Sequence, residues 1–368
     1  MLRRIGVGLG ALLFCVDPLS AQPEPVYGGR PLSAWVQDIA EHWSKEDQAL
    51  SYHDGFRPYP QPRCTITPAE REAAKAVDAI GTNCIPFLVR WLPELSPLGE
   101  GAIDAFKVLG PRASSAVLEL EKIALENPSP YCQDFARRAI ASLRWIGPDS
   151  VPAFTNIIAR IGDPVMRQFA IAALTTNGTN ASSAIPVLLD VIDNSNANVP
   201  KGVLHDAPER ADVETACSAI RALSVVGFGD PAIFLVLSNL VHHACPEYRS
   251  TGIEAIAGWG VPAVPAIAPL LDDFRTWVRR EAQSALSTIA KSAPTDKQII
   301  AAAAQGLQSQ YGPVRRWAAL TLYDASGNRA PELFDPRIPH TDMEPIYREA
   351  TNTLRRLAPE LLPPNRGG

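Results

Sequence analysis

Residues 139–147, Ala-Ile-Ala-Ser-Leu-Arg-Trp-Ile-Gly, carry the pattern that decides the fold. Ala139, Leu143 and Ile146 recur at positions i, i+4 and i+7, which places an apolar stripe along one face of an α-helix. Gly147 then suits the left-handed backbone conformation that ends many helices. A second apolar stretch begins at Val151, with proline in its second position, where its fixed φ favours a first helical turn. The segment therefore predicts two consecutive helices joined by a short link.

The same pattern recurs along the chain at intervals of about 30 to 50 residues. A single pair of helices cannot bury both of its faces, so neighbouring pairs must stack. We predict an all-α fold, an α-solenoid of about nine helix pairs over residues 68–364, with insertions near residues 194–208 and 327–345. The first helices of the nine units end at Gly81, Gly110, Gly147, Gly178, Gly227, Gly260, Ala290, Ser326 and Ala358, and prolines open several second helices at Pro86, Pro152, Pro186, Pro231 and Pro265.

The unit that begins Val278-Arg279 and continues to Ile289 resembles the short HEAT-like repeats first described in phycobilisome lyases. Arg167, Arg249 and Arg315 occupy the same place as Arg279 in their own units, and the other units lack arginine there. The resemblance implies that the second helices line the concave side of the solenoid. It indicates the fold more strongly than the function, because HEAT arrays serve as scaffolds, as transport factors and in a few enzymes.

The composition excludes several classes of protein. Of the 368 residues, 46% are hydrophobic, which allows a large core and excludes wholesale disorder. The 34 Lys and Arg against 39 Asp and Glu give a net charge of −5, which argues against a nucleic-acid partner. No apolar run reaches the length of a spanning helix, so we expect no membrane span.

The N-terminal residues predict a secretory signal peptide and a capping element for the solenoid. Residues 1–21 join two arginines, an apolar stretch and a small-residue site at Ala21, which is typical of a secretory signal peptide. We therefore expect an exported protein, periplasmic or extracellular after cleavage near Ala21. Residues 22–67 are expected to form a capping helix and a loop, with Ser33 as the N-cap and Trp35 on the helix, either in the cap's packing or as a ligand-binding aromatic.

The cysteines and histidines allow more than one interpretation. Cys217 and Cys245 could form a disulfide, could join His242 and His243 in a zinc site, or could be small buried side chains at helix ends. The remaining histidines give no shared site, because the loops that contain them lie several repeats apart.

No enzyme signature is present: the sequence lacks a phosphate loop, a nucleophile elbow and a zinc-protease motif. We therefore nominate no catalytic residue, no cofactor and no metal. The expected function is a protein-protein interaction scaffold whose groove or loop-bearing edge binds a partner protein. The alternatives are a HEAT-like lyase or other modifying enzyme, and a structural spacer without a specific ligand.

Acidic residues gather on the second helices, whereas several first helices carry arginine pairs. With second helices on the concave side, this implies a mildly acidic groove and a more basic outer face. The predicted partner-binding residues are Asp190, Asp193, Asp272 and Asp273, and the expected partner is an extended or basic protein segment.

Overall fold

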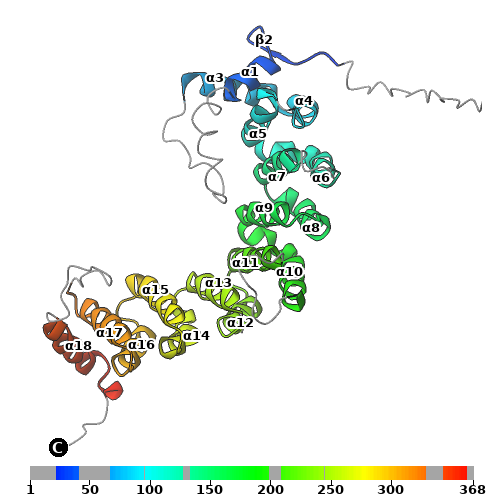
Figure 1. The fold of residues 1–368 in the computed structure, drawn as a ribbon. Helices are drawn as coiled ribbons and strands as arrows, with labels where there is room; N and C mark the ends of the chain where they lie inside the picture. The colour runs from blue at the N-terminus through cyan, green and yellow to red at the C-terminus, as the bar shows by residue number, and fades with distance from the viewer. Residues whose placement is uncertain are drawn as a thin grey trace, which may run out of the picture. The chain divides into compact units, whose positions relative to one another are not determined.

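The computed structural model describes residues 22–40, 67–94, 96–126, 133–198, 209–243, 245–328 and 343–362. The predicted signal peptide, most of the loop before residue 67, and His53, His205 and His340 lie outside these ranges. The chain forms two compact units, residues 1–149 and 150–368, and Figure 1 shows antiparallel helix pairs stacked within each. Among the described residues, no helix is both long enough and apolar enough to cross a bilayer.

The first unit begins with a short hairpin, in which β1 (Val26–Tyr27) pairs antiparallel with β2 (Arg30–Pro31). The helix α1 (Leu32–Ala40) follows and packs against α3 and α5. The remaining elements are α3 (Pro68–Ile80), η2 (Gly81–Cys84), α4 (Ile85–Trp91), α5 (Pro97–Leu109), η3 (Gly110–Ala116), α6 (Val117–Leu125) and α7 (Gln133–Ile146), with η5 (Pro148–Ser150) at the boundary of the two units.

The second unit continues the alternation of first and second helices as far as α17, and the next described helix, α18, is again a first helix. Its first part contains α8 (Val151–Arg160), α9 (Pro164–Leu174), η6 (Thr175–Ala184), α10 (Ile185–Asn198), α11 (Glu209–Val226), α12 (Pro231–Leu240) and α13 (Pro246–Ala257). Its second part contains η7 (Val261–Ala263), α14 (Val264–Ile267), η8 (Ala268–Asp272), α15 (Thr276–Ser292), α16 (Lys297–Leu307), α17 (Gly312–Ala325), α18 (Glu344–Leu357) and η10 (Pro359–Leu361).

The prediction of an all-α solenoid is confirmed. Every one of the nine repeated segments starts inside an α-helix, and these first helices are α3, α5, α7, α9, α11, α13, α15, α17 and α18. The predicted prolines all stand in the first turn of a second helix. The core consists of small alanines where helices approach closely and of large residues between layers, with Trp317, Tyr248, Phe106 and Phe154 the largest fully buried side chains.

Several first helices are followed by a glycine with positive φ, and Gly147, for which this was predicted, has φ 85°. Gly178 has φ 54° and ψ −139°, outside the left-handed helical region and in a region that glycine almost alone can occupy. Gly227 has no positive φ; a Cβ there would lie 2.7 Å from Ile233 Cγ1, so close packing requires the glycine. The positive φ, 89°, occurs two residues later, at Gly229.

The N-terminal cap differs from its prediction in one detail. Ser33 is the second residue of α1, not its N-cap, and its backbone N–H donates to the Glu24 carboxylate. The Trp35 indole donates to the carbonyl of Tyr27 at 3.1 Å, and the Arg30 guanidinium lies 4.0 Å from the centre of the Trp35 ring. These contacts attach the hairpin to α1 and give Trp35 a packing role.

Two helices extend into the predicted insertions. α10 continues to Asn198, so residues 194–198 of the first insertion are helical, and α18 starts at Glu344 with Pro345 in its first turn. Gly327 and Asn328 follow α17 in a turn, and residues 199–208 and 329–342 of the two insertions lie outside the described residues.

Burial makes the stability of the first unit depend on pH through Asp104 of α5. Burial raises the pKa of this carboxyl from 3.8 to about 6; Lys107 lowers it and Glu100 and Glu70 raise it further. Between about pH 4 and 6 the folded chain retains a proton that the unfolded chain releases, so stability decreases as the pH rises through this range. Above pH 6 the charged, partly buried carboxylate is a constant cost.

We therefore expect Asp104→Asn to raise the free energy of unfolding at pH 7 by the order of 1 kcal/mol and to flatten its pH dependence between 4 and 6. Urea unfolding at several pH values, followed by circular dichroism, measures both effects. Asp134→Asn, which removes an exposed carboxylate of α7, is the control. Equal pH profiles for wild type and Asp104→Asn would contradict the assignment.

Candidate functional site

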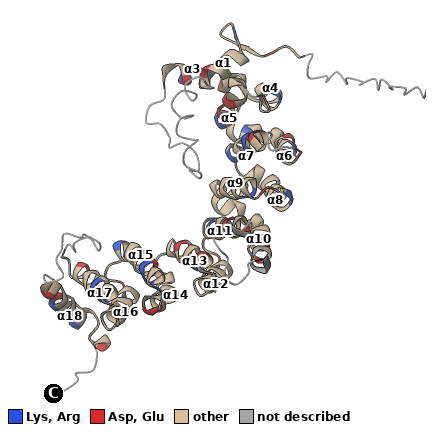
Figure 2. Ribbon diagram, viewed as in Figure 1, with Lys and Arg blue, Asp and Glu red and all other residues tan. Residues whose placement is uncertain are grey.

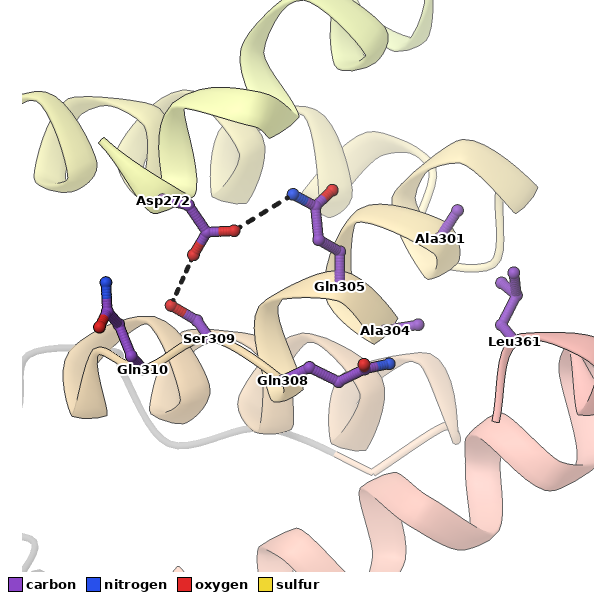
Figure 3. Close-up of a pocket in the computed structure, with 8 residues that line it drawn as sticks. All are labelled: Asp272, Ala301, Ala304, Gln305, Gln308, Ser309, Gln310 and Leu361. Carbon is purple, nitrogen blue, oxygen red and sulfur yellow. Dashed lines mark hydrogen bonds between the residues drawn. The ribbon is translucent and has the colours of Figure 1, made fainter. Parts of the chain in front are cut away.

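A hollow in the second unit lies beside the second helix α16. Its volume is about 590 Å³, and it is open to solvent (Figure 3). We call it the Gln308 hollow, and it is lined by Asp272, Ala301, Ala304, Gln305, Gln308, Ser309, Gln310 and Leu361.

The helical period of α16 places these residues together. Asp296 caps the helix by accepting a hydrogen bond from the Gln298 N–H at 2.8 Å, which fixes where the helix begins. Ala301, Ala304 and Gln305 then fall on one face, and Gln308 lies one turn further along. The two alanines are small and leave space, while the glutamines supply polar groups around it.

Asp272 comes from the preceding repeat and faces this helix across the hollow. Its carboxylate accepts a hydrogen bond from the Ser309 hydroxyl at 2.8 Å and a longer one from the Gln305 amide at 3.5 Å, both drawn in Figure 3. Each glutamine amide can donate two hydrogen bonds and accept at its oxygen. The hollow is therefore suited to groups that both donate and accept, as peptide bonds do.

The four predicted aspartates do not form one site. Asp190 and Asp193 are exposed on α10 and do not line the Gln308 hollow. Asp273 accepts from the backbone N–H of Arg275 at 2.8 Å and forms an ion pair with its guanidinium at 3.0 Å. Burial opposes ionisation of Asp273, but the hydrogen bonds and charge of Arg275 outweigh it and lower its pKa. Only Asp272 lies in the hollow.

The arginines that mark the repeat point to backbone carbonyl groups, a role that the charge pattern did not predict. Four of them donate to the carbonyl six residues earlier: Arg167 to Ile161 (2.6 Å), Arg249 to His243 (2.5 Å), Arg279 to Asp273 (2.6 Å) and Arg315 to Ser309 (2.8 Å). These carbonyls lie in the links that precede each first helix. Figure 2 shows both charge signs along the helices of each unit.

The structure bears on the three alternatives for Cys217 and Cys245, which were a disulfide, a zinc site and small buried side chains. Cys217 is buried in α11 and Cys245 precedes α13, and both are free thiols. The Cys245 N–H donates to His243 Nδ1 at 3.1 Å, and burial, with the nearby Arg249 charge, lowers the pKa of His243. Burial raises the pKa of both thiols, to about 11 for Cys245. Within the described ranges, no three His, Cys, Asp or Glu side chains gather as metal ligands.

The glutamines of the hollow were missed by sequence reasoning. The sequence does contain a signal, because the helix has alanine at 301 and 304 and glutamine at 305 and 308. These residues form an uncharged polar face with small side chains, whereas the solvent-exposed face of a helix is usually charged. Charge alone drew attention to Asp272 but not to its neutral partners.

No family model and no curated protein matches the sequence. Among solved structures, YibA from Escherichia coli is 16% identical, with 81% of this chain and 100% of that chain covered and a TM-score of 0.39. A computationally designed self-assembling cyclic homo-oligomer is 17% identical over 90% of this chain and 97% of its own, with a TM-score of 0.14. The fold assignment follows from the described helices themselves, and function has to be inferred from the chain's own surface.

Proposed function

We propose that this protein is an exported, HEAT-like scaffold without catalytic activity, and that it binds an extended segment of a partner protein in the Gln308 hollow. The lining of the hollow is the observation that supports this. Three glutamine amides, the Ser309 hydroxyl and the Asp272 carboxylate line the hollow together with two alanines. Residues 1–21 support export, and the repeat pattern supports the family.

The polar groups favour a peptide over an apolar ligand. An extended peptide exposes an N–H and a C=O at every residue, and glutamine amides can pair with both. The Leu361 side chain adds one apolar contact at the edge of the hollow. Asp272 already accepts two hydrogen bonds within the chain, so its charge would favour a basic side chain in the partner without requiring one.

Site-specific photo-crosslinking tests this function. A photoreactive phenylalanine analogue replaces Gln308 in residues 22–368, and the protein is illuminated with the exported fraction of the source cells. We expect a discrete crosslinked partner, and we expect the same analogue at Thr288, exposed on the first helix α15, to give none. Equal crosslinking at both positions, or none at Gln308, would contradict the proposal.

Substitutions then separate hydrogen bonding from charge. Changing both Gln305 and Gln308 to alanine is expected to lower partner affinity by about 5- to 150-fold, because about two hydrogen bonds of 0.5–1.5 kcal/mol each are lost. Reversing Asp190 and Asp193 to lysine should change affinity less than twofold, since these residues lie outside the hollow. Asp273 is unsuitable for reversal, because its ion pair with Arg275 supports the fold.

A further inference from the structure

A second hollow, of about 340 Å³, lies on the first helix α15, which packs against α13 (Figure 1). We call it the Trp277 hollow, and it is lined by Trp277, Arg280, Glu281 and Ser284. Trp277, Glu281 and Ser284 are four and three residues apart, and Arg280 lies three residues after Trp277, so the helical period places all four on one side of the helix. None of them lines the Gln308 hollow, and the two sites share no residue.

Glu281 holds a carboxylate oxygen that lacks a hydrogen-bond donor. Its Oε1 accepts from the Ser250 hydroxyl of α13 at 2.7 Å, which fixes the side chain across the two helices. Its Oε2 is shielded from solvent and accepts no hydrogen bond among the described residues. Burial raises the pKa of Glu281. A buried acceptor without a donor is unusual in folded proteins and is often completed by a ligand or by water.

The charges around the hollow favour a neutral ligand. Arg280 lines it, and the buried Arg249 guanidinium lies 5.8 Å from the centre of the Trp277 ring. These two positive charges disfavour a cation, and the desolvated Glu281 carboxylate disfavours an anion. The ligand has to donate to Glu281 and accept from Arg280, and a hydroxyl does both.

The indole of Trp277 adds an apolar, flat surface beside these polar groups. A pyranose ring has the matching shape and chemistry: C–H groups on one face and hydroxyls around its edge. A carboxamide side chain could satisfy Glu281 and Arg280 but has no apolar ring face for the indole. We propose that the Trp277 hollow binds a neutral saccharide, with one pyranose ring on Trp277 and its hydroxyls paired with Glu281, Arg280 and Ser284.

A glycan array probed with fluorescently labelled residues 22–368 tests this site. We expect binding to a restricted set of neutral glycans. Trp277→Ala and Glu281→Gln are expected to reduce the signal at least tenfold, the first by removing the surface under the ring and the second by removing the ionised acceptor. Circular dichroism confirms that each variant is folded.

A variant that fills the hollow with a larger side chain tests glycan binding without lowering the stability of the protein. Ser284 is exposed, so Ser284→Phe fills the hollow and should abolish glycan binding with an unchanged melting temperature. Thr288→Phe, one turn further along α15, places the same side chain outside the hollow and should bind as wild type. No glycan bound above background, or full binding by Ser284→Phe, would overturn the proposal. Gln308 variants should not affect this assay, so the two sites can fail separately.

Discussion

Replacing Arg279 with methionine is expected to lower the free energy of unfolding of the second unit by about 2–4 kcal/mol. Arg279 is buried and donates to the carbonyls of Asp273 and Phe274 at 2.6 and 2.9 Å. Its guanidinium also lies 3.6 Å from the centre of the Tyr311 ring. Methionine retains the apolar stem but leaves two carbonyls without their charged donor and removes the cation–π contact.

Arg280→Met is the matched control. Arg280 is the next residue on the same helix and is exposed, so this change removes one positive charge without removing any carbonyl contact of Arg279. Urea unfolding gives the free energies, and hydrogen exchange locates the loss in the link before α15. Arg279→Lys should recover less than half of the loss, because a single ammonium cannot bond both carbonyls and stack on Tyr311. Equal stability of Arg279→Met and Arg280→Met would rule out this role.

The same geometry explains why the repeat's arginine could be recognised but not interpreted from sequence. Position 279 and its equivalents in three other units were visible as a pattern. Their function depends on carbonyls six residues earlier, in links that have no pattern of their own. An arginine exposed to solvent and an arginine that donates to backbone carbonyls look alike in sequence, because both occur in the first turns of a helix. The structure shows that four arginines of the pattern support links between helices.

The helices themselves were predictable because their cause is local. The apolar period of residues 139–147 and its eight counterparts specify a helix face, and proline in a second helix's first turn specifies its start. Ser33 was misplaced because the hairpin between Tyr27 and Arg30 ends directly at the helix. Gly28 and Gly29, both with positive φ, form that turn. Because the turn is so short, α1 already begins at Leu32, one residue before Ser33, which was the expected N-cap.

The candidate site was less predictable because it depends on contacts between repeats. Asp272 and Asp273 are adjacent and chemically identical, yet one faces Ser309 of the following repeat and the other pairs with Arg275. No spacing rule separates them. The glutamines carry no charge, and therefore an argument from charge patterning passes over them. Glu281 shows the same limit, because its importance comes from the Ser250 hydroxyl of a neighbouring helix.

Two glycines lie inside α5, where glycine lowers the helix propensity, and tertiary packing explains why they are there. Glycine within a helix is less favourable than alanine by about 1 kcal/mol, yet α5 has Gly99 and Gly101 in its first half. A Cβ at Gly99 would lie 2.5 Å from Arg138 Nη1, the buried arginine that donates to the carbonyls of Leu92 and Glu94. A Cβ at Gly101 would collide with the carbonyl of Val36 in α1 and would lie 2.8 Å from its Cγ1. Close approach of α1 to α5 therefore requires Gly101.

Gly101→Ala is accordingly expected to destabilise the first unit by about 2 kcal/mol, as an overpacking cost of up to about 3 kcal/mol exceeds the gain of about 1 kcal/mol in helix propensity. Hydrogen exchange should show α1 losing protection first, because a backbone carbonyl cannot rotate away and the helix has to shift. Val36→Ala should not rescue the variant, since the closest contact is with the carbonyl and not with the side chain. Gly162→Ala, which has nothing within 4 Å of the added Cβ, is the control and should be neutral. Wild-type protection of α1 in Gly101→Ala would mean that α5 can move without loss, and that α1 is a looser cap than its burial against α3 and α5 implies.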